Sequence, residues 1–153
     1  MTVATGDVFV DTNVLVYARD AAAGPKQVRA AEWMTFLWRS GRGRLSMQVL
    51  HAYDHTMTRK LQPGLDAAAA REEVRQLMQW RPVDLSPAVL ERGWTVQDRY
   101  AISFWDALIV AAALDVRCDY LLTEDMQSGQ DLGGVVVLNP FEREPHEIAS
   151  VSA

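Results

Sequence analysis

The sequence predicts an α/β domain in which a parallel β-sheet carries helices on both faces. Short apolar runs alternate with longer segments whose apolar residues recur at helical spacing. Strands separated by helices in this way form parallel sheets, with the helices packed on the sheet faces. The sequence contains no repeat, no low-complexity segment and no change in composition, so residues 1–153 are expected to form one domain.

Five short strands are expected, each an apolar run bounded by polar or turn-forming residues. They are Val8–Val10, Arg44–Ser46, Pro82–Leu85, Tyr120–Thr123 and Val135–Leu138. The last of them ends at an Asn-Pro pair, which cannot continue a strand.

Helices are expected between these strands. Residues 25–40 begin with a proline after Gly24 and end at Gly41, both common helix boundaries. Further helices are expected over 48–61, which stops before Pro63, over 65–80, from 87 to about 100, and over 103–114. The polar tail from about residue 142 is expected to fray.

The composition excludes some classes of protein. A hydrophobic content of 49% and a charged content of 23% are typical of a soluble globular protein. The net charge of −5 argues against a broad electrostatic grip on nucleic acid, so any such contact must come from a local basic patch.

The expected location is the cytoplasm, without membrane contact. The single cysteine, Cys118, forms no intrachain disulfide, which fits a reducing compartment. The first residues lack the basic and apolar segments of a signal peptide. The longest apolar stretch, 107–114, is far shorter than the roughly 20 residues that span a bilayer.

Three acids stand where such a fold builds its sites. Asp11 directly follows the first strand, Asp125 lies just beyond the fourth, and Asp106 lies in the first turn of an apolar helix. Ligands of parallel sheets bind at the carboxyl ends of the strands. Clustered carboxylates repel one another unless a cation neutralises them, and oxygen ligands suit Mg²⁺ or Mn²⁺. Such a metal polarises phosphoryl oxygens and activates water.

Each acid by itself also has a purely structural explanation. Asp11 and Asn13 are suited to cap the helix that follows them, and Ser103 with Asp106 matches a capping box. Asp125 has the same alternative at a short helix. Capping and metal binding are compatible, and capping alone does not explain why all three acids fall at site-building positions.

The motifs around these acids occur in order over nearly the whole chain: "VFVDTNVLVYARD", "LSMQVLHAYDHTMTRKL", "SFWDALIVAAAL" with "DYLLTEDMQSGQ", and "VVVLNPF". In this ordered set the chain resembles PIN-domain proteins, of the kind found as VapC-like ribonuclease toxins in bacterial type II toxin–antitoxin systems. The resemblance implies a five-stranded parallel sheet in a three-layer α/β/α sandwich. It also implies Mg²⁺- or Mn²⁺-dependent cleavage of RNA by metal-activated water.

The resemblance also assigns roles and partners. The catalytic, metal-binding acids are Asp11, Asp106 and Asp125, and the polar supports around them are Thr12, Asn13 and Thr123. Family members usually form homodimers and are neutralised by a small antitoxin protein that inserts a segment near the active site.

One position departs from the family pattern. The family carries a glutamate in the helix after the second strand, and Ala52 stands there in this chain. Asp54 is turned about 200° around the helix from that position, so it is a poor replacement. The chain is therefore either a nuclease that works with three acids, weakened or not, or an impaired module that binds RNA or antitoxin. Whether Ala52 is natural or introduced stays open.

Two further groups have two interpretations each. His51, Asp54 and His55 share a helix face, as a zinc-like site or as solvated surface. The arginines around two glycines are either phosphate contacts for RNA or loop surface near a helix end; they are Arg39, Arg42 and Arg44.

The five tryptophans are expected to lie mostly in the core, with one or two at a dimer or antitoxin interface. A metal-dependent phosphatase is a third candidate function, although Asn13 stands where one phosphatase signature has a second aspartate.

Overall fold

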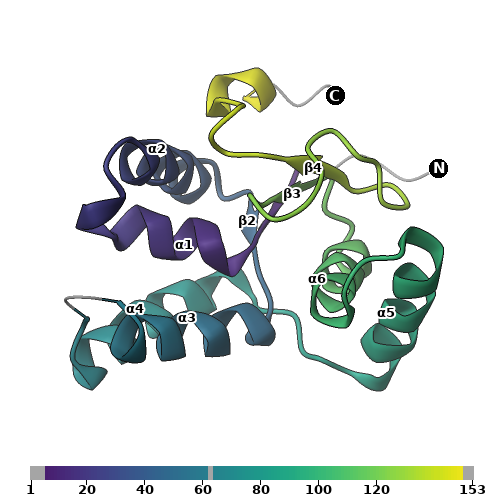
Figure 1. The fold of residues 1–153 in the computed structure, drawn as a ribbon, viewed down its shortest axis with the longest axis horizontal. Helices are drawn as coiled ribbons and strands as arrows, with labels where there is room; N and C mark the ends of the chain where they lie inside the picture. The colour runs from purple at the N-terminus through teal and green to yellow at the C-terminus, as the bar shows by residue number, and fades with distance from the viewer. Residues whose placement is uncertain (1–5, 62–63, 150–153) are drawn as a thin grey trace.

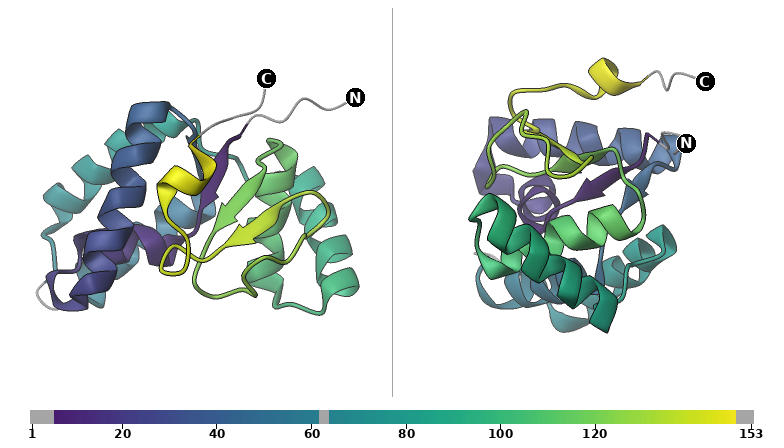
Figure 2. Two further views of the ribbon diagram at one scale, coloured as in Figure 1. Left: turned by 90° about the horizontal axis from the view of Figure 1, so that it is seen from above. Right: turned by 90° about the vertical axis from the view of Figure 1, so that its right-hand side faces the viewer.

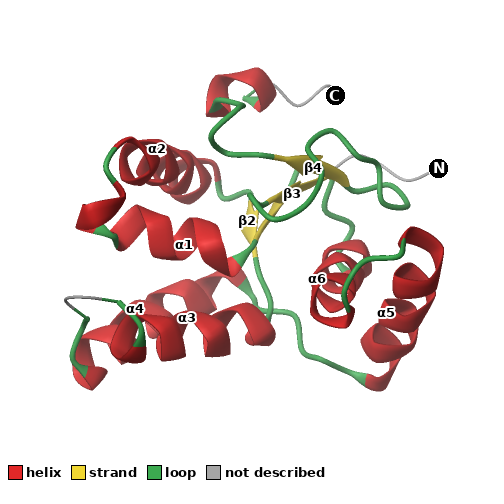
Figure 3. Ribbon diagram, in the orientation of Figure 1, coloured by secondary structure: helices red, strands yellow, loops and turns green. Residues whose placement is uncertain are grey.

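The computed structural model describes residues 6–61 and 64–149. Within them, a sheet of four parallel strands lies at the centre of the molecule (Figures 1 and 3). The strands are β1 (Val8–Val10), β2 (Gly43–Arg44), β3 (Tyr120–Leu122) and β4 (Val136–Leu138), in the order β2-β1-β3-β4. The predicted α/β fold with a parallel sheet is confirmed.

The third predicted strand, Pro82–Leu85, is reduced to a single bridge. Val83 forms one parallel bridge with Ser46, just beyond the end of β2. The Val83 amide donates to the Leu45 carbonyl at 3.0 Å, and the Met47 amide donates to the Val83 carbonyl at 3.0 Å. The segment thus joins the outer edge of the sheet beside β2, but it leaves that edge too soon to count as a strand.

The five helices predicted between the strands are present, and a further helix, for which no range was predicted, follows Asp11. The α-helices are α1 (Thr12–Arg19), α2 (Pro25–Ser40), α3 (Met47–Arg59), α4 (Ala67–Leu77), α5 (Pro87–Tyr100) and α6 (Phe104–Asp115), and the 3₁₀ helices are η1 (Ala21–Ala23), η2 (Met78–Trp80) and η3 (Pro145–Ile148). The helix predicted over 65–80 divides into α4 and η2. Pro63, the expected stop after α3, lies outside the described residues.

The strands lie between two groups of helices (Figures 1 and 2). One group contains α1 to α4, and the other is the packed pair α5 and α6. All three residues of β1 are fully buried, and seven consecutive residues of α6, from Ala107 to Ala113, are buried as well. The apolar core therefore passes through the centre of the sheet and fixes the position of its carboxyl edge.

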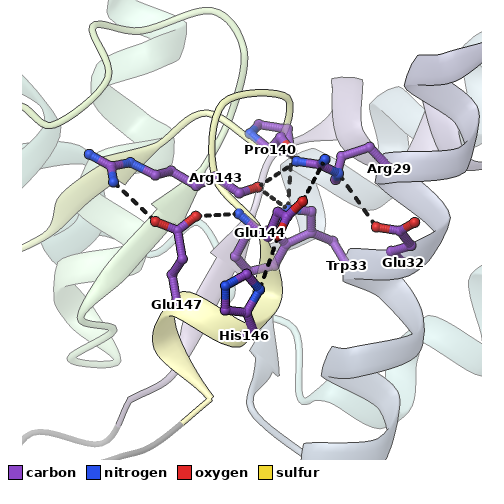
Figure 4. A network of polar contacts seen from close by, with 8 residues as sticks. All are labelled: Arg29, Glu32, Trp33, Pro140, Arg143, Glu144, His146 and Glu147. Carbon is purple, nitrogen blue, oxygen red and sulfur yellow. Dashed lines mark hydrogen bonds and ion pairs between the residues drawn. The ribbon is translucent and has the colours of Figure 1, made fainter.

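The chain folds over α2 after β4, where the sequence predicts a frayed tail. The indole nitrogen of Trp33 donates to the carbonyls of Pro140 (3.2 Å) and Arg143 (3.1 Å), and Arg29 pairs with Glu144 at 3.1 Å (Figure 4). Glu144 and Glu147 form a capping box that starts η3. These contacts order the segment up to residue 149; residues 150–153 lie outside the described part of the chain.

The tryptophans divide differently from the prediction. Trp33 and Trp80 are buried, whereas Trp38, Trp94 and Trp105 are 41%, 50% and 64% exposed. The Trp80 ring packs directly on Gly43. A Cβ atom at position 43 would lie 2.6 Å from this ring, so only glycine fits at that position of β2. No helix in the described ranges is both long and apolar enough to cross a membrane.

Candidate functional site

The pairing of β1 with β3 brings two distant acids to one edge of the sheet. Val10 and Leu122 are register partners at the ends of these strands, and the Asp11 amide donates to the Leu122 carbonyl at 3.1 Å. Asp11 and Thr123 therefore leave the sheet side by side, and Asp125 follows two residues later. This is the carboxyl edge of a parallel sheet, where ligand sites form.

Asp11 is buried and held by several hydrogen bonds. It is 7% exposed. Its Oδ1 accepts from the Thr12 amide at 2.7 Å, which makes it the N-cap of α1. Its Oδ2 accepts from the Thr123 hydroxyl at 2.8 Å. The capping explanation is thus correct for Asp11, and the same carboxylate also faces a second polar group across the edge.

Asn13 connects the two acids. Its Nδ2 donates to Asp125 Oδ2 at 3.0 Å, to Thr123 Oγ1 at 3.2 Å and to Asp11 Oδ2 at 3.4 Å. Its Oδ1 accepts from the Glu124 amide at 3.4 Å, and the Asp125 amide donates to the Thr123 hydroxyl at 3.1 Å. The amide group thus lies between two carboxylates and offers them its partial positive charge.

Asp106 reaches the same electrostatic environment from α6. Its amide donates to the Ser103 hydroxyl at 3.1 Å, which caps the helix as the sequence suggests. Burial raises the pKa of the Asp106 carboxyl, and the charge of Asp125 raises it further. A hydrogen bond between this carboxyl group and the Ser103 side chain lowers it. Asp106 therefore interacts electrostatically with the acids that follow β1 and β3, Asp11 and Asp125.

The pKa of Asp11 is strongly perturbed. Burial raises it from 3.8 to about 6, against the opposing hydrogen bonds from Thr123 and Thr12. The charges of Asp125 and Asp106 raise it further, because like charges disfavour ionisation of one another. A cluster of this kind is stabilised by a cation.

The donor chemistry of this edge fits a hard divalent cation, because carboxylate and amide oxygens are the ligands that Mg²⁺ and Mn²⁺ prefer. As placed, the side chains do not form a closed shell. Within residues 6–61 and 64–149, no group of three His, Cys, Asp or Glu side chains is positioned to hold a metal ion. The same finding applies to the zinc-like arrangement considered for His51, Asp54 and His55.

Ala52 lies on a side of α3 that looks toward α6. Gln48, one turn earlier, donates from Nε2 to the Trp105 carbonyl at 3.3 Å, directly before Asp106. Residues four apart share a helix face, so Ala52 continues this side of α3 with a methyl group that offers no ligand. The Gln48 Oε1 atom is buried and accepts no hydrogen bond from the described residues.

Two of the three arginines predicted to contact RNA have structural roles. Arg42 is 9% exposed and donates from Nε to the Gly6 carbonyl and from a terminal nitrogen to the Ile148 carbonyl, both at 2.6 Å. Arg44 donates to the carbonyls of Trp80 (3.1 Å) and Arg81 (2.9 Å).

These positions contradict the predicted RNA contact of Arg42. Its guanidinium is buried and already bonded, and Gly43 pairs with the first residue of β1, so Arg42 lies at the amino edge of the sheet. The acids lie at the opposite, carboxyl edge. Arg39, in contrast, is exposed near the end of α2.

Sequence reasoning missed a support for the loop that carries Asp125. Lys26, at the start of α2, forms an ion pair with Glu124. Its Nζ also lies 5.1 Å from the centre of the Tyr17 ring and 5.0 Å from that of Phe141. The partners are far apart in the chain, so no local pattern predicts the contact.

Comparison with known proteins identifies the family of the chain. The model of the PIN domain matches residues 8–127, which include all three acids. The chain belongs to the PIN domain family. No curated protein matches the chain.

Several solved structures share this PIN fold. A toxin–antitoxin complex from Klebsiella pneumoniae is 18% identical over 88% of this chain and 98% of that chain, with a TM-score of 0.62. DNA-bound VapBC from Salmonella typhimurium is 13% identical over 86% and 96%, with a TM-score of 0.61. VapC20 from Mycobacterium tuberculosis, described as a Sarcin-Ricin loop cleaving toxin, is 23% identical over 75% and 87%, with a TM-score of 0.54.

Proposed function

We propose that this PIN domain is a Mg²⁺- or Mn²⁺-dependent endoribonuclease and the toxin component of a toxin–antitoxin pair. The observation that carries the proposal is the mutual influence of Asp11, Asp106 and Asp125 at the carboxyl edge of the sheet, where Asp11 is buried with a pKa of about 6. Perturbed acids gathered at a site-building edge are typical of catalytic centres. The names of the structural neighbours support the same class of activity.

In this proposal the three acids hold the divalent cation. When bound, the cation supplies a Lewis acid for a phosphoryl oxygen and lowers the pKa of a water molecule. The chain supplies position: Thr12 and Thr123 fix the two oxygens of Asp11 through bonds of 2.7 and 2.8 Å. Asn13 donates to Asp125 at 3.0 Å and keeps the two sides of the edge in register.

The comparisons support one of the proposed partners. Two neighbours were solved as complexes of a toxin with its antitoxin, and we therefore propose an antitoxin protein as the partner of this chain. A homodimer as its assembly and the cytoplasm as its location are proposed from the resemblance to the family and from the single cysteine.

A second candidate function is an impaired PIN module that binds RNA or antitoxin without turnover. The observation that favours it is Ala52, whose methyl group stands on the side of α3 where Gln48 contacts the Trp105 carbonyl. A glutamate at that position would add a fourth carboxylate to the edge.

The two candidates are separated by an RNA cleavage assay with purified, antitoxin-free protein. Structured RNA is incubated with Mn²⁺, and fragments from the unsubstituted chain are compared with those from Asp11→Asn, Ala52→Glu and the exposed, remote control Asp98→Asn. For an active nuclease we expect cleavage by the unsubstituted chain and by Asp98→Asn. Asp11→Asn should lose at least about 100-fold, the effect typical of removing one electrostatic stabiliser.

Other outcomes decide against parts of the proposal. Cleavage that resists EDTA would contradict the metal dependence. Cleavage only by Ala52→Glu would identify the chain with Ala52 as the impaired module. No cleavage by either form, at any Mg²⁺ or Mn²⁺ concentration, would contradict the nuclease proposal itself.

A further inference from the structure

The most exposed large apolar side chain in the described residues belongs to the residue that directly precedes Asp106 in the chain. Trp105 is 64% exposed and is the second residue of α6. An indole that is so exposed gains little from burial in its own fold. Core packing therefore does not explain a tryptophan in the first turn of the helix that carries Asp106.

The neighbours of Trp105 hold it in place although it faces solvent. The Phe104 ring meets it edge to face, with centroids 5.1 Å apart and an angle of 70° between the planes. Its backbone carbonyl accepts from Gln48 Nε2 at 3.3 Å, which ties the first turn of α6 to α3. The indole is thus a supported ring with an open surface.

The charge of the molecule gives such a ring a role. The net charge is −5, and two arginines that looked available for phosphates, Arg42 and Arg44, are bonded to backbone carbonyls instead. Because the net charge is negative, contacts with RNA that do not depend on charge are needed to offset the repulsion between the chain and the phosphates. Aromatic side chains do so by stacking on bases, which they accept with little regard to sequence.

We propose that Trp105 is a stacking platform for an unpaired nucleobase next to the phosphate that is cleaved at Asp11, Asp106 and Asp125. This inference rests on the proposed nuclease function and deepens it. Only a base that has left its helix exposes a face to the indole, so the substrate is single-stranded or looped RNA at that nucleotide. Trp105 contacts the substrate, while Gln48 and Phe104 position the ring.

The test measures RNA binding separately from cleavage. In an Asp11→Asn background, a fluorescent RNA hairpin with an unpaired loop is titrated against the parent, Trp105→Ala, Trp105→Phe and Trp94→Ala. Trp94, on α5, is 50% exposed and serves as the matched control. We expect Trp105→Ala to weaken binding about 5- to 100-fold, Trp105→Phe to keep most of the affinity, and Trp94→Ala to match the parent.

A second arm uses the active chain and changes the RNA. Removing the base beside the cleaved phosphate should raise the KM of the unsubstituted chain. The same change in the RNA should have little further effect on the KM of Trp105→Ala. In both proteins kcat should change less than KM. Such a pattern identifies a base contact. If the ring were merely structural, Trp105→Ala would change KM by the same factor for both RNAs.

Three results would overturn the inference. An RNA affinity of Trp105→Ala within twofold of that of the parent, while the unsubstituted chain still cleaves RNA, would reject the stacking role of Trp105 and leave the proposed nuclease function standing. A change in oligomeric state in Trp105→Ala, measured by light scattering, with unchanged RNA affinity would assign the ring to an interface between copies of the chain. A parent that neither binds nor cleaves RNA would reject both the platform and the proposed function.

Discussion

The two edges of the sheet surround their first aspartate with different charges. At the amino edge, burial raises the pKa of Asp7, the charges of Arg44, Arg81 and Arg42 lower it, and the charge of Asp119 raises it. At the carboxyl edge, burial raises the pKa of Asp11, and the charges of Asp125 and Asp106 raise it further. The amino edge thus sets three arginines against one further acid, whereas the charges that act on Asp11 are those of two further acids.

The difference separates structural charge from functional charge. A buried ion that is paired and hydrogen-bonded within the chain holds the fold together. Like charges that gather without such pairing cost stability, and proteins keep them where a ligand completes the site. On this reasoning Arg42 stabilises the fold of the domain, and Asp11 is part of its candidate functional site.

The largest effect is expected at the amino edge. Arg42→Ala removes two hydrogen bonds of 2.6 Å to the carbonyls of Gly6 and Ile148, which leaves buried acceptors unpaired. We expect the free energy of unfolding to fall by about 3 kcal/mol. Urea denaturation measures it, and the exposed Arg39→Ala should change stability by less than about 0.5 kcal/mol. Equal losses in the two variants would remove the distinction between them.

A smaller effect of opposite sign is expected at the carboxyl edge. The pKa of Asp11 is about 6 in the folded chain against 3.8 as its ordinary value. The folded state therefore holds its proton more tightly, and stability is lost as pH rises from about 4 to 6. The difference between these two pKa values corresponds to a loss of about 3 kcal/mol. Asp11→Asn avoids this loss but replaces one accepting oxygen with an amide nitrogen, which costs about 1 kcal/mol, so we expect the free energy of unfolding to rise by about 2 kcal/mol above pH 6.

The measurement is thermal or urea unfolding between pH 4 and 8 in the presence of EDTA. The gain in stability from Asp11→Asn should disappear below about pH 4, where Asp11 of the unsubstituted chain is protonated in both the folded and the unfolded state. Asp98→Asn, on the surface of α5, serves as the control and should show no such pH profile. A destabilised Asp11→Asn at pH 8 would mean that its hydrogen bonds outweigh the cost of its buried charge.

The smallest effect concerns Cys118 at the amino edge. It is 3% exposed, and burial together with the charge of Asp7 raises the pKa of its thiol to about 12. We expect the folded chain to resist alkylation at pH 8, and Cys118→Ala to cost about 1 kcal/mol. Mass spectrometry after iodoacetamide treatment measures the reaction, with the urea-unfolded chain as the reactive control. Rapid labelling of the folded chain would show that this edge is open to solvent.

Local patterns in the sequence were enough to predict the helices and the central strands. The proline and glycine around α2 and the serines before α5 and α6 fix helix boundaries through bonds within one turn. The positions of Asp11 and Asp125 after apolar strands followed from the same local logic, because parallel strands end at one edge.

Contacts between distant residues could not be predicted in this way. Val83 pairs with Ser46 only because α3 and α4 return the chain to the sheet edge. The tail is ordered by Trp33 and Arg29, more than one hundred residues earlier in the chain. The burial of Arg42 and the exposure of Trp105 likewise depend on which elements cover them, and an arginine or tryptophan carries no local signal of that.

The pairing of β1 with β3 has a consequence for the synthesis of the chain. Asp11 precedes the α-helices of the described residues, whereas its partner strand, Tyr120–Leu122, and Asp125 follow them. While these helices are still being made on the ribosome, the growing chain therefore carries Asp11 without the edge to which it belongs. The acidic edge is completed only after the helices have been made, so the assembled cluster first exists when Asp125 has left the ribosome with them.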